Sequence, residues 1–178
     1  MRNKKIYILL TKFSGKTAKL VDFLTAYHYN HVSIGLEEDT NTFYSFLSKG
    51  FVIEEITRYI KPERSPFPCR LFEIGVTEEE YNYIKAIIMT FKSKKKVLKY
   101  SKMGVFLGLC GIPYKKSDHY FCSQFVAEVL EESKVVPLKK SSTKFFPKDF
   151  NGIKEAKVTF QGDHKSMLEF FKLNDASI

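Results

Sequence analysis

The sequence has few cysteines and no long apolar run, and both absences restrict what this 178-residue chain can be. Its three cysteines, Cys69, Cys110 and Cys122, are odd in number and widely spaced, which argues against a disulfide framework or a zinc knuckle. No apolar stretch approaches the ~20 residues of a transmembrane helix. The apolar N-terminal stretch ends at Leu10 without a signal-peptide cleavage site, so we expect a cytoplasmic protein.

The composition is that of a folded domain with a basic surface. Hydrophobic residues make up 44% of the chain and aromatic residues 15%, which predicts a single domain over 1–178 with one sizeable core. The net charge is +9, with lysines concentrated at 92–96 and 139–140. These lysines form either a solvated helix end or a patch for an anionic polymer or membrane surface. No aromatic-basic motif accompanies them, so we predict no specific nucleic-acid partner.

Hydrophobic periodicity predicts a block of strands followed by a group of helices. Strands are expected over 5–13, 31–36, 42–47, 51–56, 70–76 and 157–160. Helices are expected over 16–27, from Thr77 to about Phe91, over 101–110 and 120–133, and in a short tail near 166–172. Thr77 and Glu80 form a capping box at the start of the second helix. This order predicts an α+β fold with a largely antiparallel sheet.

Two possible ligand motifs are weak, and we predict neither a cofactor nor a metal. Residues 14–17 (SGKT) follow a strand like the end of a phosphate-binding loop, but Leu10 stands where that motif requires glycine. His28 and His31 are three residues apart, so an extended chain directs them to opposite faces. His119 precedes the cysteine helix and is either a loop residue or a ligand or substrate contact.

Cys122 lies in the first turn of a predicted helix, and this is the strongest chemical signal in the chain. A helix N-terminus favours a thiolate and supplies N–H donors for a developing oxyanion. Phe125, Val126 and Val129 share the face of Cys122, which directs the thiol into the domain. A structural core cysteine has the same pattern, so this helix alone does not establish a nucleophile.

His31 begins a predicted strand and is the candidate partner of Cys122. Along this strand Val32, Ile34 and Leu36 form one face, and His31, Ser33 and Gly35 form the other. We expect the cysteine helix to pack on the small polar face. The alternative is that His31 faces solvent. A third group usually orients such a histidine, and the predicted hairpin partner offers Ser45 or Tyr44, depending on register.

Residues 29–36 (YNHVSIGL), a hairpin, and residues 120–126 (YFCSQFV) together resemble the circularly permuted NlpC-type papain-like hydrolases, the YiiX-like group. Lecithin:retinol acyltransferase-type enzymes share that permuted arrangement, in which the histidine strand precedes the cysteine helix. Residues 146–150 (FPKDF) are also similar to that group. The resemblance covers about 5–155 and implies a permuted papain-like fold with the nucleophile helix packed on an antiparallel sheet.

The resemblance implies a cysteine peptidase or amidase-type hydrolase, or an acyltransferase, acting on a peptide or isopeptide amide or an acyl ester. It implies Cys122 as nucleophile, His31 as base and a polar third residue on the following strand, where Ser45 is the nearest match. Two alternatives stay open, the first because Ser45 is not a carboxylate and the second because of the lysines at 92–96. One is an inactive domain of this fold that binds a small ligand, and the other is a basic interaction protein.

Overall fold

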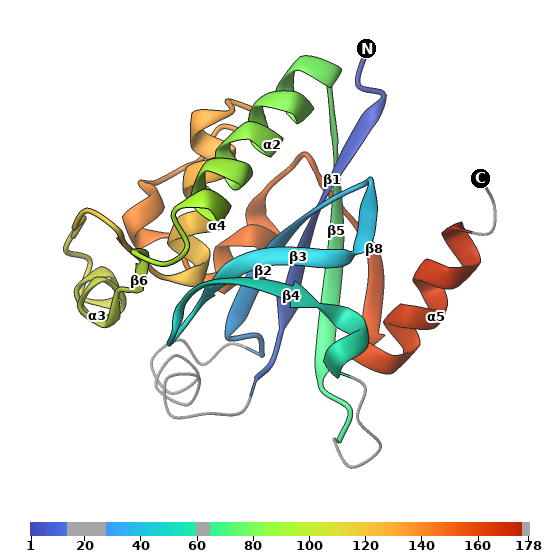
Figure 1. The fold of residues 1–178 in the computed structure, drawn as a ribbon, viewed down its shortest axis with the longest axis horizontal. Helices are drawn as coiled ribbons and strands as arrows, with labels where there is room; N and C mark the ends of the chain where they lie inside the picture. Colours follow the sequence, from blue (N-terminus) through green and yellow to red (C-terminus); the bar gives the residue numbers. More distant parts are fainter. Residues whose placement is uncertain (14–27, 60–64, 176–178) are drawn as a thin grey trace.

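The computed structural model describes residues 1–13, 28–59 and 65–175, which form an α+β architecture around a six-stranded sheet (Figure 1). The strand order is β4-β3-β2-β1-β5-β8, and every neighbouring pair is antiparallel. The strands are β1 (Lys4–Thr11), β2 (His31–Leu36), β3 (Asp39–Leu47), β4 (Gly50–Glu55), β5 (Pro68–Val76) and β8 (Ala156–Asp163). The predicted α+β class and antiparallel sheet are confirmed. The helix expected over 16–27 and the 14–17 motif lie outside the described residues.

Four α-helices are described, and their ends follow local capping chemistry. They are α2 (Glu78–Ser93), α3 (Lys102–Leu109), α4 (Cys122–Glu132) and α5 (His164–Asp175). The Thr77–Glu80 capping box is present as predicted. The Asp163 carboxylate accepts hydrogen bonds from the N–H groups of Lys165 and Ser166, so α5 begins before the expected position. Within the described part of the chain, no helix is both long and apolar enough to cross a bilayer.

The sheet separates two apolar layers. Helices α2 and α4 cover one face, and α5 lies on the opposite side (Figure 1). The larger layer joins side chains of α2 and α4 to inward-facing residues of the strands, among them Ile8, Ile34 and Phe46. The smaller layer joins Leu9 and other strand residues to α5. Alternation along each strand therefore supplies both layers, because successive side chains point to opposite faces.

Helix α4 packs on the apolar face of β2, so the expectation that it sits on the face of Ser33 and Gly35 is wrong. Its buried side chains belong to one cluster with the apolar face of β2, which consists of Val32, Ile34 and Leu36. Removing two apolar surfaces from water favours this contact. Gly35 faces Phe43 instead, and a Cβ there would come 2.8 Å from the Phe43 ring.

A short parallel strand pair, absent from the sequence prediction, leads the chain into α4. β6 (Lys99–Tyr100) pairs with β7 (His119–Tyr120), and each strand has only two residues, too few for a periodic signal. The segment before β6 lies against the β3–β4 hairpin, where Gly50 has a φ of +103°. A side chain at Gly50 would collide with the Leu98 carbonyl. The chain therefore passes close against the hairpin directly before it enters β6.

Candidate active site

Cys122 is the first residue of α4 and is buried, with 6% of its surface exposed. The preceding residue, Phe121, occupies the N-cap position in extended conformation and provides no side-chain cap. Serine, threonine, asparagine or aspartate usually accepts the hydrogen bonds of first-turn N–H groups at this position. The Phe121 side chain has no polar atom, so the N–H groups of the first turn, next to the Cys122 sulfur, have no side-chain acceptor at the N-cap.

His31 forms a buried pair with Glu54. Its Nε2 donates to Glu54 Oε1 over 2.8 Å, and both side chains are 4% exposed. His31 is the first residue of β2 and Glu54 the fifth of β4, so β3 lies between the two strands. Because Glu54 occupies Nε2, the ring nitrogen that remains for another group is Nδ1.

The surroundings of His31 favour the charged imidazolium. Burial lowers the pKa of His31, but the Glu54 charge and hydrogen bonds to Cys122 and Glu54 outweigh burial and raise that pKa to about 10. The Cys122 side chain therefore lies within interaction range of the imidazole. The structure thus brings together the two residues that the sequence analysis paired, and it places them at the junction of β2 and α4.

Ser45 does not orient His31, so the prediction of Ser45 as the third residue is wrong in geometry. Its hydroxyl donates to the Val32 carbonyl oxygen over 2.6 Å, and no space remains for solvent around it. Tyr44, the other residue predicted as a possible third group, packs in the apolar layer that contains α2 and α4, on the opposite face of the sheet from Ser45. Ser45 lies on β3, the strand between β2 and β4. Phe43 pairs with Glu54, and Ser45 is two residues beyond Phe43, so Ser45 and Glu54 point to the same face of the sheet. A small side chain there leaves room for the His31–Glu54 contact.

A sequence signal for Glu54 exists, although the sequence analysis did not use it. Val52 and Ile56 lie two residues before and two residues after Glu54, and both are apolar. Glu54 is therefore a carboxylate at a strand position where the pattern predicts an apolar residue. A carboxylate that takes a buried position normally needs a partner, and His31 is that partner. The third residue was predicted on the strand directly paired with β2, whereas the carboxylate comes from β4, one strand further along the sheet.

Several polar groups around the pair are buried and have no hydrogen-bond partner in the described structure. Thr11 pairs directly with His31 across β1 and β2, and its hydroxyl is one of them. The Ser123 hydroxyl and both amide atoms of Gln124, next to Cys122 in the first turn of α4, are others. Buried polar groups without partners cost free energy, so their presence here is consistent with a site that binds polar groups of a ligand.

Two aromatic rings complete the surroundings. The Phe13 ring lies beside His31, with ring centroids 4.8 Å apart. Burial, and after it the charge of Cys122, raise the pKa of Tyr100 in β6 well above its usual value. The Cys122 and His31 side chains are both buried, and low access of water strengthens electrostatic interactions between them.

The other sulfur and histidine candidates lie in different environments. Cys69 is fully buried, its sulfur is 3.7 Å from that of Met167, and burial raises its pKa to about 12. Cys110 is exposed at the end of α3. His119 lies in β7, where its Nδ1 is 2.8 Å from the Ser117 carbonyl oxygen. Among the described residues, no cluster of histidine, cysteine and acidic side chains has the arrangement of a metal site.

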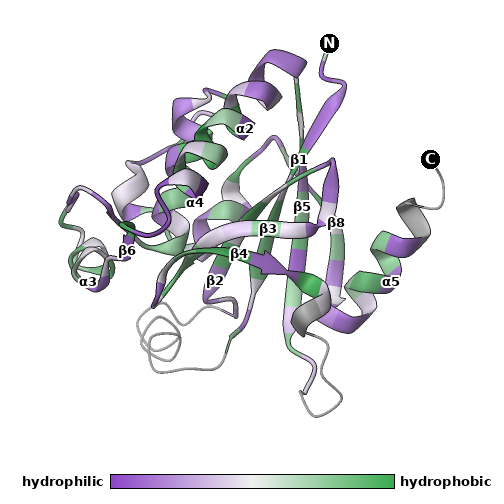
Figure 2. Ribbon diagram, in the orientation of Figure 1, coloured by the Kyte–Doolittle hydropathy of each residue, from purple (hydrophilic) through white to green (hydrophobic). Residues whose placement is uncertain are grey.

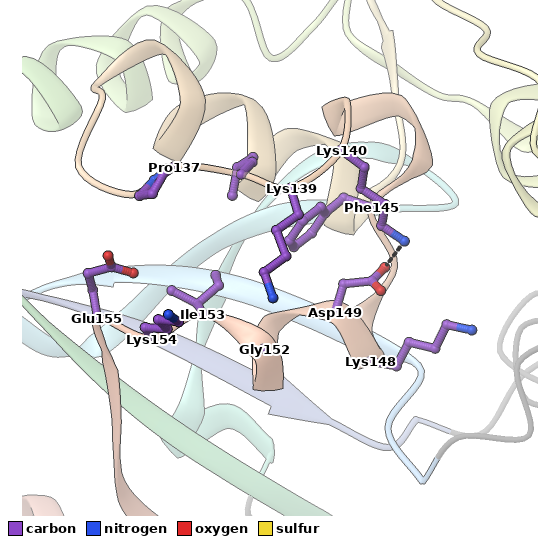
Figure 3. Close-up of a pocket in the computed structure, with 11 residues that line it drawn as sticks. Pro137, Lys139, Lys140, Phe145, Lys148, Asp149, Gly152, Ile153, Lys154 and Glu155 are labelled. Carbon is purple, nitrogen blue, oxygen red and sulfur yellow. Dashed lines mark ion pairs between the residues drawn. The ribbon is translucent and has the colours of Figure 1, made fainter.

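A cavity of about 630 Å³ lies away from Cys122, between the end of α4 and β8. Its floor is apolar, with Phe145 and Ile153, and lysines surround its rim (Figure 3). Lys140 on this rim pairs with Asp149 over 2.7 Å. None of Cys122, His31 and Glu54 contributes to its lining, so this cavity is separate from the candidate active site.

Comparison of the chain with models of known protein families gives no match, and comparison with curated proteins gives no similar sequence.

Proposed function

We propose that the chain is a cysteine-dependent hydrolase or acyltransferase of permuted papain-like fold, with Cys122, His31 and Glu54 as its catalytic group. The observation that carries the proposal is the buried His31–Glu54 pair beside a thiol at a helix N-terminus. Such a triad, in which a third group holds the base and the base contacts the nucleophile, recurs on unrelated folds. The strand with the histidine precedes the helix with the cysteine, as in the permuted group.

In the proposed reaction, His31 Nδ1 holds the proton that leaves the Cys122 thiol, and Glu54 stabilises the imidazolium through Nε2. The Cys122 sulfur attacks the carbonyl carbon of an amide or ester and forms a tetrahedral intermediate. His31 then donates its proton to the leaving amine or alcohol, which leaves an acyl thioester on Cys122. Water or a second acceptor, deprotonated by His31, attacks the thioester and releases the acyl group.

The oxyanion of each intermediate accepts hydrogen bonds from backbone N–H groups at the start of α4, including that of Cys122. These groups have no side-chain acceptor, since Phe121 provides no cap. The positive end of the helix dipole favours negative charge at the same point. The unpartnered Ser123 and Gln124 side chains supply further polar contacts to the substrate.

The substrate class in this proposal is a peptide or isopeptide amide or an acyl ester, acted on in the cytoplasm. The main alternative, an inactive ligand-binding domain, depended on the lack of a carboxylate beside His31. Glu54 removes that reason for preferring it. No metal or organic cofactor enters the proposed reaction.

The proposal is tested by alkylation at neutral pH with limiting iodoacetamide, followed by mass mapping of the three cysteines. We expect Cys122 to react at least tenfold faster than exposed Cys110, because an adjacent imidazolium favours the thiolate. His31→Ala should slow the reaction at Cys122 and leave Cys110 unchanged. Cys110 is thus an internal control within the same molecule.

Incubation with a p-nitrophenyl acyl ester supplies the second measurement. Intact-mass analysis should show one acyl group added to the wild-type chain and none to Cys122→Ala. Equal alkylation of Cys122 and Cys110, together with no acyl adduct, would contradict the proposal.

A further inference from the structure

One continuous segment of the chain, residues 81–117, accounts for the whole net charge of the molecule. It contains nine of the 29 lysine and arginine residues and none of the 20 acidic residues. The rest of the chain is therefore neutral on balance. Lys85 and Lys115 pair with Glu38 and Glu128, and the other seven lysines of the segment are exposed. A surface of this kind attracts polyanions.

The same segment also exposes large apolar side chains. Of the seven large hydrophobic residues that are exposed in the described chain, five lie here: Tyr83 on α2, and Val97, Met103, Phe106 and Ile112 on or near α3. Each is more than half exposed. Met103 and Phe106 are three residues apart on α3 and share a face, since such positions are neighbours on a helix surface. Exposed apolar residues that gather in one place mark an interaction site.

The inner side of α3 explains why these residues face outward. Gly104, Val105 and Gly108 are buried, and Val105 packs in one cluster with Phe121 and Phe146. A Cβ at Gly108 would come 2.8 Å from the Thr143 carbonyl oxygen, so α3 approaches the body of the protein with its small residues. Its larger side chains remain outside. Figure 1 shows α3 at the end of the molecule remote from α5, and Figure 2 shows apolar α3 beside hydrophilic connections.

We infer that α3 and its flanking lysines dock on an anionic lipid bilayer, with Met103, Phe106 and Ile112 entering the interface between headgroups and acyl chains. Apolar side chains surrounded by lysines are the pattern of interfacial membrane attachment. Lysines close to a membrane are attracted by anionic headgroups, and this attraction decays within a Debye length. The inference does not depend on the proposed chemistry of Cys122.

The observations favour a bilayer over two other occupants. A nucleic acid would leave Met103 and Ile112 without a role, and the segment has no arginine, the residue that most often reads bases and stacks on them. A second copy of this chain would bring two segments of like charge together, which is unfavourable. An anionic bilayer accommodates both the charge and the exposed apolar side chains.

The first test is co-sedimentation of the full chain with vesicles. We expect binding to vesicles of 30% phosphatidylglycerol in phosphatidylcholine, at least fivefold weaker binding at 0.5 M than at 0.1 M NaCl, and none to phosphatidylcholine alone. Lys94→Glu, Lys95→Glu and Lys96→Glu combined should reduce binding at least fivefold. The matched control, with Lys148→Glu, Lys154→Glu and Lys157→Glu, makes the same charge change elsewhere and should bind within twofold of wild type.

The second test separates insertion from surface attraction. Met103→Ser, Phe106→Ser and Ile112→Ser combined should weaken vesicle binding at least fivefold, whereas Tyr83→Ser with Val158→Ser should not. The chain has no tryptophan, so Phe106→Trp provides a single fluorescent reporter. Its emission should shift to shorter wavelength on addition of anionic vesicles, and that of Val158→Trp should not.

The inference would be overturned if the wild-type chain did not bind vesicles at 0.1 M NaCl, or if the triple serine variant bound them unchanged. It would also be overturned if a DNA or RNA duplex bound through the same lysines while vesicles did not bind. A circular dichroism spectrum equal to that of wild type confirms that each variant is folded. An increase in mass by light scattering that the triple serine variant abolishes would instead assign this surface to self-association.

Discussion

Two buried thiols, Cys122 and Cys69, lie on opposite sides of the same sheet and differ in their neighbours. Cys122 is 6% exposed and Cys69 is not exposed at all, so burial does not separate them. Cys122 begins a helix and is one of the groups that raise the pKa of His31, which pairs with Glu54. Cys69 lies inside β5 and contacts Met167 of α5.

The chemistry of a thiol depends more on the charges and hydrogen-bond donors around it than on its exposure. An imidazolium stabilises a thiolate, whereas a thioether and apolar side chains favour the neutral thiol. Burial accordingly raises the pKa of Cys69 to about 12, with a smaller contribution from the Asp163 charge. The cysteine within β5 is a packing residue, and the cysteine at the start of α4 is the candidate nucleophile.

The largest expected effect comes from removing each thiol in turn. Cys122→Ala should abolish turnover of any substrate, by at least 10⁴-fold, because the covalent intermediate cannot form. Cys69→Ala should leave turnover within twofold and lower the free energy of unfolding by about 1–2 kcal/mol through a small cavity. Turnover with a p-nitrophenyl ester and urea denaturation measure the two effects. Equal loss of turnover in both variants would remove the distinction.

The next effect is the pH dependence of stability. The pKa of His31 is about 10 in the folded protein and 6.5 as its ordinary value. Its contribution to stability is therefore fully present below pH 6.5 and is lost as the pH rises from 6.5 to about 10. The slope approaches about 1.4 kcal/mol per pH unit for one proton. Urea unfolding at several pH values should show this slope in wild type but not in His31→Gln. Parallel curves for both proteins would refute the assignment.

A smaller effect is expected from neutralising the carboxylate. Glu54→Gln keeps the size of the side chain but removes the charge that raises the pKa of His31. We expect about a 100-fold loss in the rate of Cys122 alkylation and turnover, with a lower apparent pKa in the pH profile. Glu55→Gln, the neighbouring residue on the other face of β4, is the matched control and should change the rate less than twofold. A similar loss in both variants would indicate general damage to β4.

The smallest effect tests whether Ser45 has a chemical role. Ser45→Ala should change turnover by less than threefold, because its hydroxyl bonds to the Val32 carbonyl oxygen and not to His31. Ser45→Val should be more damaging, since a branched side chain on β3 would occupy the space between His31 and Glu54. Turnover and alkylation rates distinguish the two. A 100-fold loss in Ser45→Ala would restore Ser45 as the third catalytic residue.

Local sequence signals predicted most of the fold. The capping box at Thr77 and the alternating residues of β2 and β4 depend on near neighbours, and the structure has these elements where expected. The apolar face of α4 was also predicted correctly, since Cys122, Phe125, Val126 and Val129 belong to one buried cluster. The two-residue strands β6 and β7 were missed because so short a segment has no period. The start of α5 was missed because Asp163 was not taken as a cap.

Local patterns in the sequence were enough to predict most elements and two members of the candidate site, Cys122 at a helix start and His31 at a strand start. The tertiary structure decided which face of β2 receives α4 and that Glu54, rather than Ser45, holds the imidazole. The physical reason is that a periodic pattern reports only which side chains share a face. Partners across a sheet depend on strand order, register and curvature, which arise from packing of the whole chain.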